Sequence, residues 1–434
     1  MKLTIFQGVV LGIFALGAIV GLLVFSLYSG SGSKSVGAVV IWGTFPQQDI
    51  QAALTAIIQT EPTLKDVSYV QKDPATFDAT LVSAIAAGAG PDLVLASQED
   101  LITLASALQP IPSGKLSART FASDFTAGSQ IWEAPSTIGS YGIPFLIDPL
   151  ILYANQPLLA SNGIAQTPST WEALTGLVPQ VTLKGNNSTL SRELIALGTY
   201  SNISDARAIL STLFLQSGAP ITVLSSVGQV APDLGLQSAS GGEPPGDSVV
   251  RFYTQFADST KVSYTWNNSL PTSQLEFANG DLALYLGYAS EASYFKEANP
   301  NLSFDTSPVP ELQSATSKFT YGKIYAFSIP HGAKNPNGAL TAALALASSG
   351  SAESAAASAT GLAPALRALL ATTPGDSIGA TTYTSALYAG GWLSPSPSAT
   401  DQIFSSMIGS VNSGQLSIAA ALANAQSALS AILQ

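Results

Sequence analysis

Strand-like and helix-like segments alternate along residues 36–108, and this alternation limits the folds open to the chain. Residues 36–42 form an apolar, β-branched run, which is typical of a buried strand. Residues 50–58 carry apolar side chains at helical spacing. The same two patterns recur in strand-like segments at 67–70 and 92–96 and in helix-like segments at 77–85 and 100–108. Such alternation predicts an α/β fold with a parallel sheet covered by helices on both faces.

Later segments continue this pattern less regularly. Thr170 precedes a helix-like segment as a candidate N-cap, and Gly280 ends another. Beyond Pro336 the chain is alanine-rich and reads as helical to its end. Further strand-like or extended segments stand at 141–155, 282–286 and 324–329, whereas 180–245 shows little pattern. The 434 residues suffice for two to four domains at roughly 100–200 residues each.

Composition excludes several classes of function. Asp and Glu outnumber Lys and Arg by 27 to 16, so the formal charge is −11 and the chain lacks the basic balance needed to hold nucleic acid through its phosphates. There is no cysteine and one histidine, His331, which excludes disulfides, thiolate sites and multi-histidine metal sites. We therefore expect no metal, no cofactor and no nucleic-acid partner.

Residues 8–28 form an uncharged apolar run of 21 residues. About 20 helical residues cross the hydrocarbon core of a bilayer, so this run predicts a transmembrane anchor. The expected order is a cytoplasmic N-terminus at 1–7, the anchor in the lipid bilayer at 8–28 and a Gly/Ser tether at 29–36. A cleaved secretory signal is the alternative, although its apolar region is usually about 7–15 residues and ends near an Ala-x-Ala site. Either interpretation places the rest of the chain outside the cell.

Five short phrases, in this order, resemble extracellular solute-binding proteins of the maltose-binding type, which serve ABC importers. Each phrase combines glycine, proline or an aromatic residue with an apolar segment. The phrases are AAGAGPDLV at 86–94, YGIPF with LYAN at 141–155, GIAQTPSTW at 163–171, FANGDLAL at 277–284 and IPHGAKNP at 329–336. Two departures are the anchor-like helix and a late glycine-rich turn reduced to 321–323.

The resemblance implies a type II periplasmic-binding-protein-like fold, with two α/β lobes joined by crossing segments near 146–150, 310–320 and 375–385. The implied lobes are 37–147 with 318–378, and 148–317 with 379–434. In such proteins a ligand between the lobes stabilises the closed form by its higher affinity for that form. The closed form then docks on an ABC permease in the membrane.

Candidate ligand-binding residues come from two sources. Ligands of open α/β sheets bind beyond the carboxyl ends of the strands, which selects Trp42, Thr44, Phe45, Gln47, Ser97 and Gln98. The resemblance adds Tyr141, Asp148, Tyr288 and Trp392, the last of which we expect to be exposed. Core packing for Trp42 and a turn-capping role for Asp148 are open alternatives. Trp266 lies in a predicted loop, where packing and ligand contact are both open.

These observations predict a membrane-anchored extracellular protein that binds a small solute, a sugar or oligosaccharide, for an ABC importer. Aromatic faces suit the C–H groups of a pyranose ring, and amide or carboxylate groups suit its hydroxyls. One alternative is a sensor or adhesive scaffold without transport. Another is a glycoside hydrolase, which needs two facing carboxylates among Glu133, Asp148, Glu193 and Asp281, but no motif sets such a pair. We therefore expect a binding protein and not an enzyme.

Overall fold

The computed structural model describes residues 35–133, 139–185, 189–225, 228–235, 237 and 241–433. The predicted anchor at 8–28 and nearly all of the tether lie outside the described residues. Among the residues that are described, no helix is both long and apolar enough to cross a membrane.

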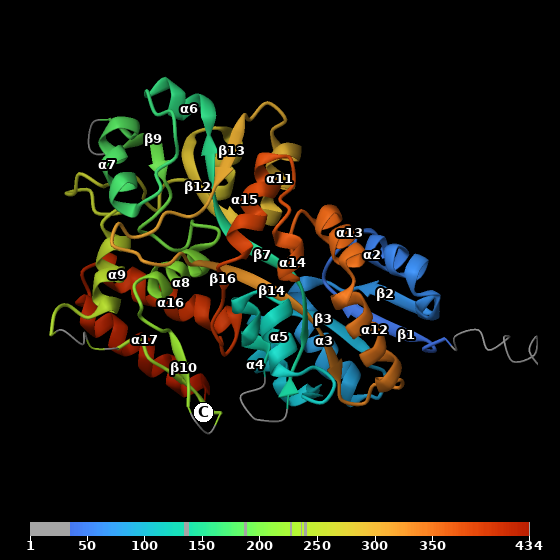
Figure 1. Ribbon diagram of the computed structural model, residues 1–434. Coiled ribbons are helices and arrows are strands. Elements are labelled where there is room, and N and C mark those ends of the chain that lie inside the picture. The colour runs from blue at the N-terminus through green and yellow to red at the C-terminus, as the bar shows by residue number, and fades with distance from the viewer. Residues whose placement is uncertain are drawn as a thin grey trace, which may run out of the picture.

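A mixed β-sheet runs through the whole protein (Figure 1). Its strands follow the order β2-β1-β3-β14-β7-β12-β9-β8. Their bounds are β1 Val39–Gly43, β2 Val67–Gln71, β3 Leu93–Ser97, β7 Ile143–Asn155, β8 Leu183–Lys184, β9 Leu190–Ile195, β12 Leu282–Tyr288 and β14 Thr320–Pro330. Four short strands add to it: β4 Leu108–Gln109, β13 Phe304–Ser307, β15 Ala363–Pro364 and β16 Ala389–Gly390. Two small separate sheets pair β5 Ile111–Pro112 with β6 Gly139–Ser140, and β10 Thr222–Leu224 with β11 Val230–Pro232.

Helices cover both faces of this sheet (Figure 1). Those before residue 200 are α2 Gln47–Thr60, α3 Phe77–Ala86, α4 Leu101–Leu104, α5 Ala118–Asp124, α6 Gln156–Ser161 and α7 Trp171–Val181. The next are α8 Ala206–Gln216, α9 Pro245–Thr254, α10 Ser273–Asn279 and α11 Ala292–Ala298. The last are α12 Pro336–Ser348, α13 Gly350–Thr360, α14 Arg367–Leu370, α15 Ser377–Ala386, α16 Pro397–Asn412 and α17 Ile418–Leu433. The helix expected over 100–108 is thus shorter than predicted, because Leu108 leaves it to pair with Pro330 of β14.

The first lobe is built around three parallel strands. β1 pairs in parallel with β2 on one side and β3 on the other, as the alternating pattern predicts. The helix α2 buries Ile50, Ala53, Leu54 and Ile57, which share one face. It packs against α13 from the far end of the sequence, so distant segments complete one apolar core.

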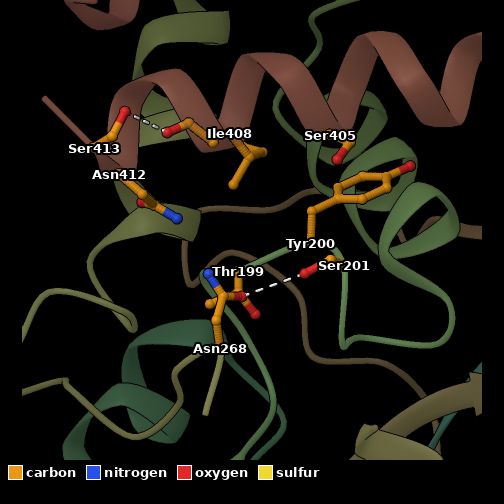
Figure 2. A pocket seen from close by; sticks show the side chains of 9 residues that line it. Thr199, Tyr200, Ser201, Asn268, Ser405, Ile408, Asn412 and Ser413 are labelled. Carbon is orange, nitrogen blue, oxygen red and sulfur yellow. Dashed lines mark hydrogen bonds between the residues drawn. The ribbon is translucent and has the colours of Figure 1, made fainter. Parts of the chain in front are cut away.

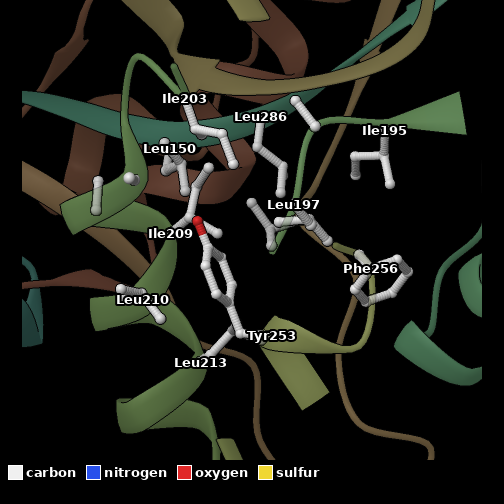
Figure 3. Packing of buried hydrophobic residues seen from close by; sticks show 14 of the residues in the cluster. Leu150, Ile195, Leu197, Ile203, Ile209, Leu210, Leu213, Tyr253, Phe256 and Leu286 are labelled. Atoms are coloured by element: carbon white, nitrogen blue, oxygen red, sulfur yellow. The ribbon is translucent and has the colours of Figure 1, made fainter. Parts of the chain in front are cut away.

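The second lobe has its own apolar core. β12 pairs in parallel with β9, and α8 and α9 pack beside them. Figure 3 shows Tyr253 among Ile209, Leu213 and Leu197 of this core. The hydroxyl of Tyr253 donates a 2.6 Å hydrogen bond to the Thr199 carbonyl, so burial leaves it paired.

Two long strands connect the cores. The first half of β7 packs in the first core and its second half, from Leu150, in the second. β14 is antiparallel to both β3 and β7, with Tyr321 in the second core and Ile324 in the first. The chain therefore crosses between the lobes within β7 and again within β14, and it returns once more between Ala389 and Trp392.

Candidate functional site

The carboxyl ends of the strands meet where the lobes join. Ser97, the last residue of β3, pairs with Tyr325, so β14 extends past the end of β3 toward the second lobe. There Lys323 pairs with Asp148 of β7. Two residues further along β7, Leu150 pairs with Tyr288, the last residue of β12. We refer to Asp148, Tyr288, Tyr321, Lys323 and Tyr325 as the crossing site.

Asp148 joins the crossing strand to a loop of the second lobe. Its carboxylate accepts hydrogen bonds from the Ser290 amide at 3.1 Å and the Ser290 hydroxyl at 2.7 Å. Burial raises the pKa of Asp148 to about 6, although the charge of Lys323 and the two hydrogen bonds act in the opposite direction. The carboxylate therefore fixes the loop that follows β12.

Tyr288 is held from two sides. Its carbonyl accepts a 2.6 Å hydrogen bond from the hydroxyl of Tyr153, which is fully buried in the second core. The Lys323 ammonium lies 4.2 Å from the centroid of the Tyr288 ring, within the range of a cation–π interaction. Lys323 is partly exposed, so its charge stays available at the junction of the lobes.

Carboxyl groups surround this lysine. Burial and the charges of Asp78 and Glu99 raise the pKa of Asp100, in the turn that follows β3, to about 7. On the second lobe, the Tyr285 hydroxyl lies 3.1 Å from Asp205 Oδ2 and 2.6 Å from Glu291 Oε2. One hydroxyl carries one proton, so it donates to one of these two oxygens at a time. Burial and the neighbouring Glu291 raise the pKa of Asp205 well above its usual value, so Asp205 favours its protonated form beside Glu291. The arrangement offers several hydrogen-bonding groups to a ligand.

An ion pair links the two lobes beside the crossing site. The Arg207 Nη1 of α8 lies 2.7 Å from Glu99 Oε1, and the Tyr321 hydroxyl donates to that same oxygen at 2.7 Å. Burial alone would raise the pKa of Glu99, but Arg207 and Lys323 hold it below its usual value. Glu99 is therefore ionised throughout the neutral range.

This geometry can be compared with known proteins. Residues 53–377 match the family described as bacterial extracellular solute-binding protein. The chain belongs to this family. No curated protein matches it by sequence. Membership confirms the expectation of a binding protein, not an enzyme, and the family's description places such binding domains outside the cell.

Solved structures confirm the two-lobed α/β fold of this solute-binding protein. One is the cyclic alpha-maltosyl-1,6-maltose binding protein from Arthrobacter globiformis, with TM-score 0.73, 15% identity, and coverage of 91% of this chain and 98% of that chain. A second is the GacH receptor of Streptomyces glaucescens, with TM-score 0.67, 17% identity, and coverage of 92% of this chain and 98% of that chain. A third is the maltotriose binding protein of Thermus thermophilus, bound with maltotriose. Its TM-score is 0.64 and its identity 16%, and the match covers 91% of this chain and 100% of that chain. Identities this low establish the fold alone.

The predicted residues at the carboxyl edge of β1 reach the crossing site through Phe45. The ring of Phe45 packs edge-on against Tyr325, with 4.6 Å between centroids. Trp42 is partly exposed, and the Lys72 ammonium lies 3.6 Å from the centroid of its ring. Thr44 is partly exposed and Gln47 exposed. This edge of the solute-binding protein thus keeps aromatic and polar groups accessible.

The predicted residues after β3 are engaged with the protein itself. Gln98 is fully buried, donates to the Gly322 carbonyl at 2.9 Å and accepts from the Ile324 amide. Ser97 accepts a 3.0 Å hydrogen bond from the Glu99 amide. Both side chains therefore position the crossing strand β14 and Glu99.

Two predicted tryptophans lie in the core of the second lobe. The expected exposure of Trp392 is wrong, because only 4% of the residue is exposed and its Nε1 donates to Ser211 Oγ at 2.9 Å. Glycines and prolines beside it in sequence do not prevent its ring from stacking on Phe404. Trp266 is fully buried and donates to Asn202 Oδ1 at 3.1 Å, which supports loop packing. Tyr141, partly buried, packs against the first core.

Of the carboxylates considered for glycoside hydrolysis, Glu193 and Asp281 lie near each other at the far end of β12 from Asp148, and Glu133 lies outside the sheet strands. Glu193 pairs with Leu282 at the amino end of β12, and Asp281 directly precedes that strand. The crossing site lies at the carboxyl end of β12, about 20 Å away at roughly 3.3 Å per residue. Glycosidase carboxylates are separated by roughly 5–10 Å, so neither residue faces Asp148 as a catalytic pair.

A separate polar cavity of about 280 Å³ lies on the second lobe (Figure 2). The loop before α8, the loop before α10 and one side of α16 with its C-cap line it: Thr199, Tyr200, Ser201, Asn268, Ser405, Ile408, Gly409, Asn412 and Ser413. Tyr200 lines the cavity, and its hydroxyl donates a 2.6 Å hydrogen bond to Asp401, which does not line it. The cavity is thereby connected to the residues around Arg207.

Sequence reasoning missed most of the charged residues at the junction. Asp205 and Arg207 stand in the stretch where the pattern is weak, and Lys323 looked like part of a turn. Asp100 could have been predicted, because it follows β3 by three residues and ligands of open α/β sheets bind beyond the carboxyl ends of the strands.

Proposed function

We propose that this solute-binding protein captures a sugar or oligosaccharide between its lobes and delivers it to an ABC permease. The observation that carries the proposal is the crossing site with its edge, where the partly exposed rings of Phe45 and Tyr325 stand near the Asp148 carboxylate and the Lys323 ammonium. Carboxylates accept hydrogen bonds from sugar hydroxyls, and aromatic faces pack against sugar C–H groups. The Thermus thermophilus relative, bound with maltotriose, supports this class of ligand.

Among the predicted residues, we propose Trp42, Thr44, Phe45, Gln47, Asp148 and Tyr288 as ligand contacts or their immediate supports. Asp100 and Glu291 join them because they follow the carboxyl ends of β3 and β12. Asp205 joins them through its contact with the Tyr285 hydroxyl, and Lys323 because it pairs with Asp148. The surplus of carboxylates favours neutral sugars over sugar phosphates or sugar acids, because like charges repel.

Thermal unfolding of the full chain, in a detergent without a sugar headgroup, tests the proposed function. A bound sugar at a hundredfold excess over its Kd stabilises the folded state by about 2.7 kcal/mol. We expect such a shift with maltotriose or another neutral oligosaccharide of a panel. Lys323→Met should reduce the shift, whereas Lys334→Met, a control at an exposed lysine, should not. No shift with any sugar would contradict the proposal.

Lys72→Ala should raise the affinity for a sugar that stacks on Trp42. The ammonium of Lys72 occupies the face of the ring, and an exposed cation–π contact contributes about 0.5–1 kcal/mol. A stacking sugar must displace it, so its removal should lower Kd about two- to fivefold, as measured by titration calorimetry. Lys65→Ala, at an exposed lysine of the same lobe, is the matched control. An unchanged Kd would remove Trp42 from the ligand contacts.

We further propose that residues 8–28 anchor the protein as a single membrane pass with the N-terminus inside. The length and lack of charge of this segment support the proposal. The full chain should stay with membranes after alkaline carbonate extraction, and a variant that lacks residues 8–28 should be released. Release of the full chain under the same extraction would contradict the anchor.

A further inference from the structure

The two lobes contact each other directly through a charged pair. Glu99 belongs to the single 3₁₀ turn that follows β3 of the first lobe, and Arg207 to the first turn of α8 in the second. Their side chains are only 7% and 12% exposed, and 2.7 Å separates the paired atoms. The pair is therefore shielded from the solvent screening that weakens surface ion pairs.

Residues of both sides hold this pair in place. On the second lobe, Arg207 Nε lies 3.4 Å from Asp401 Oδ1, which also accepts a 2.6 Å hydrogen bond from Tyr200. On the crossing strand, the Tyr321 hydroxyl donates to Glu99 Oε1 at 2.7 Å. Asp401 thus positions Arg207 within the second lobe, and Tyr321 holds Glu99 from the crossing strand.

A second direct bond lies on the same side of the junction. Thr103 Oγ1 of α4 donates to the Pro395 carbonyl at 3.2 Å, in the segment that leads into α16. This hydrogen bond and the Glu99–Arg207 ion pair connect the two lobes directly, with no ligand between them. Separating the lobes would break the ion pair and leave Glu99 without the arginine that balances its buried charge, which is unfavourable.

We propose that Glu99 and Arg207 form a latch that holds the lobes together before any ligand binds. This inference rests on the two-lobed fold and does not depend on the identity of the ligand. A protein whose binding-competent form is already populated binds more tightly, because the apparent Kd rises as that population falls. The latch therefore sets the ligand affinity without contributing a ligand contact.

Distance measurements between the lobes test the latch in the absence of sugar. The chain has no cysteine, so two introduced cysteines can be spin-labelled specifically in the full chain. Gln48 and Ser293 are exposed positions beyond the carboxyl ends of β1 and β12, one on each lobe. Double electron–electron resonance on the labelled Gln48→Cys, Ser293→Cys chain should give one short distance.

Arg207→Met should shift this distribution to longer distances, since the methionine keeps the apolar stem and removes the charge. Glu99→Gln removes the other charge of the pair and should give the same shift. The test can therefore still be made if one of the two variants does not fold. Arg251→Met is the matched control, because it breaks the exposed Glu243–Arg251 pair within the second lobe. Unchanged distances in the folded Arg207→Met and Glu99→Gln proteins would overturn the latch. Sugar binding plays no part in the measurement, so failure of the proposed function would not affect it.

Discussion

Trp392→Ala should lower the free energy of unfolding by about 3–5 kcal/mol, the usual cost of removing a buried large aromatic side chain. The ring stacks on Phe404 with 6.3 Å between centroids, and its Nε1 pairs with the fully buried Ser211 hydroxyl. Its removal leaves both a cavity and a buried hydroxyl without that partner. Urea unfolding followed by circular dichroism measures the loss.

Two further variants separate packing from ligand contact. Trp392→Phe should recover part of the stability, because it keeps a ring against Phe404. Leu387→Ala changes a residue that is 47% exposed nearby in the sequence, and should alter stability by no more than about 0.5 kcal/mol. Full stability of Trp392→Ala together with lost sugar affinity would instead make this tryptophan a ligand contact.

The protein should be most stable at mildly acidic pH and lose stability as the pH rises from about 4 to about 7. Burial raises the pKa of Asp148 from 3.8 to about 6, and that of Glu311 from 4.5 to about 7. In this window the folded state binds more protons than the unfolded chain, so the free energy of unfolding falls with pH. For the buried Asp148 alone, the loss is on the order of 3 kcal/mol at about 1.4 kcal/mol per pKa unit. Glu99, whose pKa is lowered, acts in the opposite direction.

Glu353 offers the sharpest test of this dependence. It is fully buried in α13, where burial holds its pKa well above 4.5 while one carboxyl oxygen accepts from the Leu366 amide at 2.9 Å. Glu353→Gln keeps the shape of the side chain and cannot ionise, so unfolding free energies measured in urea between pH 4.5 and 8 should vary less than in the parent protein. Glu61→Gln, at an exposed position of the same lobe, should leave the slope unchanged. Stability that increases with pH in the parent protein would contradict the expectation.

Local patterns predicted the fold well because the forces behind them are local. The Thr170 hydroxyl caps α7 by accepting from the Ala173 amide, and Gly280 ends α10 with a positive φ of 89°. The proline-bounded extended stretch predicted at 141–155 is the strand β7, which runs through both cores. The division of the chain between the lobes, residue by residue, stays a prediction.

The candidate site was harder to predict, because side-chain direction depends on contacts far away in sequence. The strand-end rule located Gln98 correctly, but its amide is taken up by β14, more than 200 residues later. Arg207 meets Glu99 across 108 residues, and no short window of sequence contains that pair. The strand-end positions of Ser97 and Gln98 were therefore predictable from the sequence, whereas the partners of their side chains and the burial of Trp392 were not.

The shared strands β7 and β14 have a consequence for how the protein melts. Each carries main-chain hydrogen bonds in one lobe and continues directly into the other. If one lobe unfolded, the halves of β7 and β14 in that lobe would lose their hydrogen-bond partners. The sheet of the other lobe would then end in strands with unpaired main-chain groups. The two halves are therefore coupled through the backbone, and heating should produce a single calorimetric peak with no half-melted species.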